Sequence, residues 1–135
     1  MASAAAELQK AIVSTLRGDA QLAALLGGEK LFDHAPASVV FPYLTFGRAS
    51  LYDWGTATEE GSEHLLTLHA WSKGKGRREA LEIMQRVTEL LHDRPPALAG
   101  FALVSLRLES SEVRYDDEQD VHHGAMRFRA IVEGG

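Results

Sequence analysis

The stretch "HLLTLHAWSKGKGRREALEIMQRVTELL", residues 64–91, decides the fold because the period of its apolar residues changes midway. Over 64–72 polar and apolar residues alternate, which predicts a strand. One face of this strand carries Leu66, Leu68 and Ala70, and the other carries Leu65, Thr67, His69 and Trp71. Over 77–92 the spacing becomes helical. The apolar stripe of this helix consists of Ala80, Ile83, Met84, Val87, Leu90 and Leu91. The stretch therefore predicts a strand and a helix that packs back on the sheet.

The residues on either side supply further elements. A helix is predicted over 2–19, with Ser3 as its N-cap, and a single helical turn over 20–28. Strands are predicted around Leu31 and Phe32 and over 41–50, 101–113 and 122–133. The order predicts an α+β fold, in which one domain over 1–135 has a mostly antiparallel sheet of four to five strands with two helices packed on one face.

The strands predict two unlike faces of this sheet. In the last strand Met126, Phe128, Ala130 and Val132 alternate with Arg127 and Arg129. In the strand before it the predicted apolar face is Ala102, Val104, Leu106 and Leu108. The opposite sheet face carries Thr67, His69, Trp71, Arg127 and Arg129. That set is too mixed for a second core layer, so this face is predicted to meet either solvent or a partner.

Composition excludes several classes of protein. The 135 residues are 45% hydrophobic and carry a formal net charge of −5, which argues against nucleic-acid binding by charge attraction. There is no cysteine, so disulfides, thiolate metal sites and cysteine nucleophiles are excluded. The N-terminus lacks the order of a secretion signal, and no apolar run approaches the roughly 18 residues of a membrane span. We expect a soluble protein without a membrane partner.

The basic loop 73–77, "KGKGR", resembles a phosphate-binding loop in composition but not in pattern. A P-loop needs Ser or Thr after the lysine, and none follows Lys75. The dinucleotide pattern needs its third glycine where Glu79 stands, and a carboxylate there would repel a pyrophosphate. A solvated strand–helix loop is the better interpretation.

No cofactor or metal is predicted. His64 and His69 face opposite sides of one strand, and His122 and His123 also diverge. A cross-strand pair of His69 with His123 is geometrically possible, but sheet-surface histidines are the simpler interpretation. The acidic residues of 112–120 lack the spacing of a calcium loop, so a solvated or partner-facing hairpin tip is predicted there.

Two polar segments, 50–62 and 111–121, are predicted as long loops suited to contacts with other proteins. The first contains Tyr52 and Trp54. Two interpretations remain open for these aromatic side chains: they fold back over the sheet edge, or they anchor an interface.

The whole chain resembles the small tail-completion, or tail-terminator, proteins of long-tailed phages and phage-derived gene transfer agents. The resemblance rests on the order of segments that are weak alone. These are "LRGDAQLAALLGG" (16–28), "KLFDHAP" (30–36), "FPYLTFG" (41–47), the opening stretch, and "VSLRLESSEVRYDDEQDVHHGAMRFRAIVE" (104–133). They cover nearly all of the chain.

The resemblance implies structural work without catalysis. Such proteins form a ring, commonly of six copies, on the head-proximal end of the tail tube. The ring stops tube polymerisation and joins the tail to the head connector, or stopper, protein, and DNA passes through its lumen without specific binding. The implied location is the cytoplasm during assembly and then the tail of the particle. Two alternatives stay open, a neck or connector protein of the same machine and a small phosphate-ligand-binding protein.

A ring built from one chain needs two different complementary patches on each subunit. We expect Tyr52 and Trp54 to act as interface anchors. The residues expected in charged contacts are Arg77, Arg78, Asp116 and Asp117. The sheet surface with Arg127 and Arg129 is a further candidate for contact with a neighbouring subunit.

Overall fold

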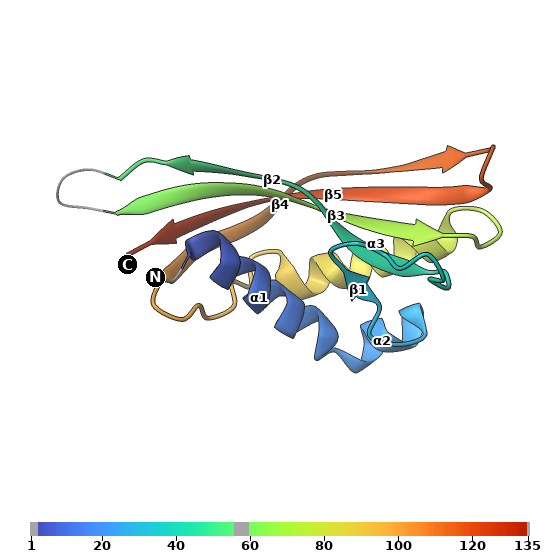
Figure 1. Ribbon diagram of the computed structural model, residues 1–135, viewed down its shortest axis with the longest axis horizontal. Coiled ribbons are helices and arrows are strands. Elements are labelled where there is room, and N and C mark those ends of the chain that lie inside the picture. The colour runs from blue at the N-terminus through green and yellow to red at the C-terminus, as the bar shows by residue number, and fades with distance from the viewer. Residues whose placement is uncertain (1–2, 56–59, 135) are drawn as a thin grey trace.

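The computed structural model describes residues 3–55 and 60–134 and shows one sheet with helices on a single face (Figure 1). The elements are α1 (Ala4–Arg17), α2 (Ala20–Leu26), β1 (Leu31–Phe32), β2 (Tyr43–Asp53), β3 (Gly61–Ser72), α3 (Arg78–Leu91), β4 (Ala102–Asp116) and β5 (Val121–Glu133). The α+β prediction is confirmed, with α2 as a third helix where one turn was expected. Among the described residues, no helix has the length and apolar character needed to cross a membrane.

The strand order is β1-β2-β3-β5-β4. Only β1 runs parallel to its neighbour, and it pairs with only two residues of β2, Leu44 and Thr45. The four long strands alternate in direction, because β2 and β3 form one hairpin, β4 and β5 form another, and β3 pairs antiparallel with β5. The two hairpins turn at opposite ends of the molecule, since β2 ends and β3 begins at one end while β4 ends and β5 begins at the other (Figure 1).

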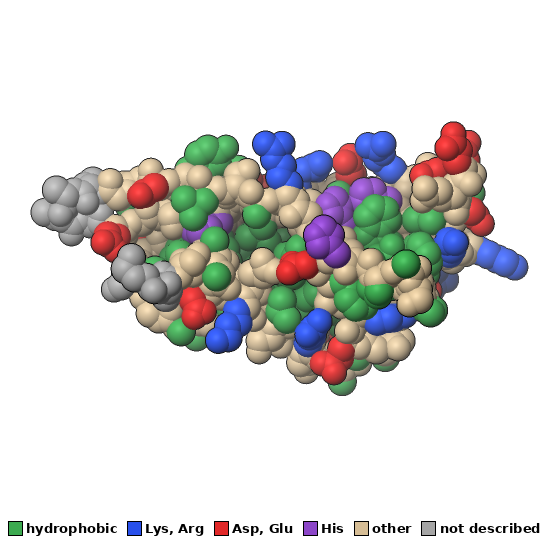
Figure 2. Space-filling model, in the orientation of Figure 1, with side chains coloured by type: hydrophobic (Ala, Val, Ile, Leu, Met, Phe, Trp, Pro, Cys, Tyr) green, Lys and Arg blue, Asp and Glu red, His purple; other side chains and the backbone are tan. Residues whose placement is uncertain are grey.

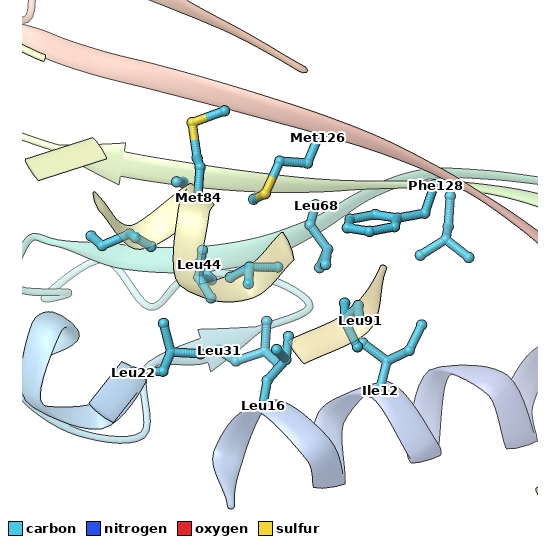
Figure 3. Packing of buried hydrophobic residues seen from close by; sticks show 14 of the residues in the cluster. Ile12, Leu16, Leu22, Leu31, Leu44, Leu68, Met84, Leu91, Met126 and Phe128 are labelled. Carbon is cyan, nitrogen blue, oxygen red and sulfur yellow. The ribbon is translucent and has the colours of Figure 1, made fainter. Parts of the chain in front are cut away.

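The core lies between the sheet and the three helices (Figure 3). The alternation predicted for β3 and β5 is confirmed, since every second residue of each strand is buried under the helices. The sheet contributes Leu44, Leu68, Met126 and Phe128, and the helices contribute Ile12, Leu16, Leu22, Ile83, Val87 and Leu91. Burial of this apolar area is the main force that holds the helices on the sheet.

Two polar caps fix the helices in place. Ser3 caps α1, as predicted, by accepting the N–H of Ala6 at 3.2 Å. Asp19 caps α2 by accepting the N–H of Leu22, and it also accepts two hydrogen bonds from Arg86 on α3, at 2.9 and 2.7 Å. The bonds from Arg86 are the largest cause of the lowered pKa of Asp19. This forked contact ties α2 to α3.

The prediction for the apolar face of β4 is wrong at two positions. Ala102 and Val104 are exposed, whereas Leu103 packs against the core. The register shifts between Leu103 and Ser105, and again between Leu108 and Ser110. Each bulge adds one residue to β4 and so reverses which face the following residues occupy.

The predicted loops 50–62 and 111–121 are also wrong, because strands occupy most of both segments. β2 continues to Asp53 and β3 starts at Gly61, while β4 continues to Asp116 before a turn that leads into β5. Residues 56–59 lie outside the described residues. The two hairpins extend past the helices, so the inner faces of their ends need no apolar pattern.

Candidate interaction surfaces

Aromatic and histidine side chains form a cluster on the outer face of the sheet, the face without helices. The Trp71 ring stacks on His123 with centroids 4.0 Å apart and planes 1° apart. On its other side it stacks on Tyr43 at 6.2 Å. The Trp71 indole N–H donates to the Thr45 hydroxyl at 2.9 Å. Three strands therefore meet in one stack, which holds the outer face together without a second hydrophobic layer.

His69 and His123 are directly paired within this cluster. Their Nδ1 and Nε2 atoms lie 2.6 Å apart, so one ring donates and the other accepts. Burial is the largest cause of the lowered pKa of both rings, reinforced by Arg127 beside His69 and by His69 and Arg114 beside His123. No third ligand completes a metal site, since no group of three or more His, Asp or Glu that could hold an ion occurs in the described residues.

The arginines of the outer face are matched by carboxylates on neighbouring strands. Arg129 on β5 pairs with Glu63 on β3. Arg127 lies 3.6 Å from Glu112 on β4. Both arginine side chains remain about half exposed. The two arginines thus lie on the outer face as predicted, and the face between the hairpin tips carries both signs of charge.

The end of the β2–β3 hairpin exposes apolar side chains. Leu51 is 50% exposed, Tyr52 57% and Trp54 40%. Trp54 packs across the hairpin on Gly61, where an added Cβ would overlap its ring. A mostly apolar groove of about 240 Å³ opens beside these residues, between α1 and the β2–β3 ladder. Trp54 therefore folds back over the hairpin, while Tyr52 points outward with no ring partner among the described residues.

The opposite end of the sheet carries charge of both signs. Figure 2 shows acidic side chains gathered at the right-hand tip and basic ones projecting beside them. Asp116 accepts the N–H groups of Glu118 and Gln119, which shapes the acidic turn, and Asp117 is exposed. The basic side chains Arg77 and Arg78 are also exposed, and Arg78 pairs with Glu82 at 2.9 Å. Both charged patches thus lie at one end.

The basic loop 73–77 shows why it is a poor phosphate site. Glu79 lies in the first turn of α3, and its carboxylate accepts a 2.6 Å hydrogen bond from Ser72. The Ser72 hydroxyl in turn accepts the N–H of Gly74 at 3.1 Å. The acidic side chain and the serine therefore take the positions that an anion would need at the helix N-terminus.

Both borders of the sheet contain unpaired strand, which the sequence did not reveal. We define the β2 edge as residues 47–53, which lie beyond the short β1. We define the β4 edge as residues 109–116, which lie beyond the point where His92 and Asp93 bond to the strand. The inner side of each segment pairs with β3 or β5, and in the described part of the chain no strand pairs with the outer side of either segment.

The eight predicted site residues fall into three separate places. Tyr52 and Trp54 lie at one end of the sheet. Arg127 and Arg129 lie on its outer face. The opposite end carries Arg77, Arg78, Asp116 and Asp117. The structure does not bring these groups into one pocket, so the arrangement suits several contacts with large partners better than one small-molecule site.

Comparison with known proteins gives consistent matches. The family described as "Tail completion protein gp17" matches residues 10–133. The tail completion protein gp17 of Bacillus phage SPP1 is 29% identical over 92 residues, which are 68% of each chain. Its solved structure superposes with a TM-score of 0.63 and 25% identity over 94% of this chain and 89% of that one. A chain from the virion of a native gene transfer agent particle has a TM-score of 0.89 and 27% identity, covering 99% of this chain and all of that one.

Proposed function

The chain belongs to the family of tail completion proteins of the gp17 type and has a structural role in phage-like tails, and from this premise we propose that it forms a ring, of six copies, that caps the head-proximal end of the tail tube. The ring stops tube polymerisation and joins the tail to the head connector. The protein works without catalysis, in the cytoplasm during assembly and then within the particle tail. The full-length similarity to a chain of a gene transfer agent virion carries this proposal.

The two unlike ends of the sheet support a role between two different partners. One end presents Leu51, Tyr52 and Trp54, and the other presents the acidic turn and the basic loop. A ring that sits between a tube and a connector needs two chemically distinct rims. We assign Tyr52 and Trp54 to one rim and Arg77, Arg78, Asp116 and Asp117 to the other.

The outer sheet face suits the lining of a DNA passage. Arg127 and Arg129 each have a carboxylate partner, so they attract phosphate less than unpaired arginines would. The formal net charge of −5 acts in the same direction. DNA would then pass through the lumen without being held by counterion release. In this arrangement the helices lie on the outside of the ring.

Electron microscopy of particles made without this protein tests the proposal. The expected result is overlong tubes, or finished heads beside uncapped tails of variable length. Filled heads that leak DNA, with tails of normal length, would instead identify a neck or connector protein of the same machine.

The two rims can be tested separately by complementing that deletion. Tyr52→Asp should disrupt one rim, and Asp116→Asn with Asp117→Asn should weaken the other. One variant is expected to leave overlong tubes and the other to leave capped tails that do not attach to heads. The same defect from both variants would contradict the assignment of the two ends to two partners.

A further inference from the structure

The backbone groups of the β2 edge that point away from the sheet belong to alternate residues. The Trp54 N–H donates to the Gly61 oxygen at 3.1 Å, which faces residue 54 toward β3. Because antiparallel strands alternate between bonded and non-bonded pairs, Tyr52 also faces β3, whereas Leu51 and Asp53 point their N–H and C=O groups outward. Before the bulge at 47–48, the Leu44 N–H also points outward, where it donates to the backbone oxygen of Lys30 at 2.9 Å.

On the β4 edge, too, the outward backbone groups belong to alternate residues. The Leu106 oxygen accepts the N–H of Asp93 at 2.8 Å, and the Leu108 N–H donates to His92 Nδ1 at 2.8 Å. These groups point out of the sheet but already have partners. Beyond the bulge the outward groups belong to Ser111, Val113 and Tyr115.

The two edges match each other in direction and in face. Two strands, β3 and β5, separate them, and neighbouring long strands alternate in direction, so β2 and β4 run antiparallel. Leu51 is in register with His64 and Val113 with Gly124, both on the helix side of the sheet. On both edges, the residues whose backbone groups point away from the sheet therefore have their side chains on the helix side. Pairing them across two copies would keep the helix face and the outer face continuous.

The exposed side chains of the two edges also complement each other. Arg48 on the β2 edge is exposed and forms no ion pair within residues 3–55 and 60–134. The β4 edge offers the exposed carboxylate of Asp116, which lies opposite Arg48 when Leu51 pairs with Val113. Leu51 and Tyr115 are each about half exposed. Opposite charges and apolar pairs across strands each stabilise a ladder.

We propose that neighbouring copies join by an antiparallel ladder between the β2 edge of one copy and the β4 edge of the next. This inference rests on the ring proposed above and adds how the ring closes. The partner is a second copy of this chain, and the product is one continuous sheet around the lumen.

The offset that this ladder requires agrees with the geometry of closed sheets. Within one copy Leu51 is level with Leu106 and Ala130. Ser111 and Val113 are level with Met126 and Gly124. Pairing Leu51 of one copy with either residue of the next therefore shifts the two copies along the strands by 130 − 126 = 4 or 130 − 124 = 6 residues. That is about 13–20 Å along the strands against about 19 Å across four strands. The resulting tilt of about 35–45° is the tilt found in closed sheets.

Engineered disulfides give the most direct test, because the chain has no cysteine to interfere. In assembled particles, Leu51→Cys with Ser111→Cys, or Leu51→Cys with Val113→Cys, should produce oxidant-dependent covalent multimers on a non-reducing gel. Within one copy these residues lie on opposite borders of the sheet, beyond the reach of a disulfide. The matched control is Leu51→Cys with Val104→Cys. Val104 is exposed on β4 but lies outside the β4 edge, because the contacts of His92 and Asp93 with the strand separate it from residues 109–116.

Covalent multimers with Ser111→Cys or Val113→Cys, and none with Val104→Cys, support the ladder. Multimers with Val104→Cys alone would overturn the proposed register. A product that joins Leu51→Cys to a different protein would overturn the choice of partner. If removing the protein gives overlong tubes but no cysteine pair crosslinks, the ring cap stands and the edge pairing fails.

Proline separates backbone pairing from side-chain contact. Leu51→Pro removes an N–H that β3 does not use, so the isolated protein should keep its fold. Complementation should fall by about tenfold or more, because proline lacks the backbone N–H and so removes a hydrogen bond from the ladder between copies. Leu51→Thr keeps the N–H and should complement within about twofold. Equal loss with both variants in folded protein would show a side-chain contact and overturn the ladder.

Discussion

The two faces of the sheet use the same strands but are stabilised by different forces. On the helix face Leu68, Met126 and Phe128 are fully buried. On the outer face the partly buried rings of Trp71 and His123 stack on each other, and Arg129 pairs with Glu63. Alternation along a strand thus separates two tasks. One face supplies stability through burial, and the other can carry chemistry for partners at little cost to the fold.

Phe128→Ala should give the largest effect, because it empties part of the core. We expect a loss of about 3–5 kcal/mol in the free energy of unfolding, since a buried phenylalanine leaves both lost apolar contact and a cavity. Urea denaturation measures this loss. Arg127→Ala, the neighbour on the outer face, is the control and should change stability by less than about 1 kcal/mol. Equal losses would contradict the division between the faces.

Trp71→Ala should be the most damaging change on the outer face and still cost less than the core variant. The Trp71 side chain stacks on both His123 and Tyr43, so we expect a loss of about 2–3 kcal/mol in the same denaturation measurement. Trp71→Phe keeps an aromatic ring but loses the hydrogen bond to Thr45, which should cost about 1 kcal/mol. A cost as large as that of Phe128→Ala would mean that the outer face is a second core.

The paired histidines should make stability depend on pH between about 7 and 5. Burial lowers the pKa of His69 and His123, so the folded state resists protons that the unfolded state accepts below about 6.5. The free energy of unfolding should therefore fall as pH falls through this range, by at most about 1.4 kcal/mol per pH unit for each histidine. His123→Gln should flatten the slope, measured by urea denaturation at several pH values.

Arg129→Gln should have the smallest effect on stability. Its pair with Glu63 is partly exposed, and pairs of this kind contribute about 0–1 kcal/mol. We expect a thermal melting temperature within a few degrees of the unchanged protein. A larger shift would show that the ion pair does more for the fold than surface pairs usually do. An unpaired Glu63 in the variant should also make the outer face more acidic.

Much of the fold could be predicted because period and burial agree over the middle of the sheet. The alternation of residues 126–132 and the helical stripe of 80–91 both meet the core as expected. The prediction failed where no core lies beneath the strand. Residues 50–53 and 114–116 extend past the helices, so their polar pattern was mistaken for loop. It failed again at Val104, because nothing in single-residue spacing marks a bulge.

The candidate site was less predictable because it depends on which residues meet across strands. The alternation placed Arg127, Arg129, His69 and Trp71 on one face, as the register confirms. It could not show that Glu63 lies beside Arg129, or that His69 lies beside His123, because register between distant segments is set by the whole sheet. The free edges were hidden for the same reason, since an edge is a property of strand order.

The two bulges of β4 also determine how this strand tolerates mutation. Each bulge reverses the face of the residues that follow it, so the middle segment of β4 is out of phase with the segments on either side of it. Deleting one bulged residue would remove the bulge and leave the residues on both sides of it on their present faces. Deleting a residue between the bulges would instead reverse the face of every position on one side of the deletion, as a frameshift does to codons. Deletions should therefore be tolerated at the two bulges and not in the regular segments beside them, and single substitutions at the bulged positions are comparatively neutral.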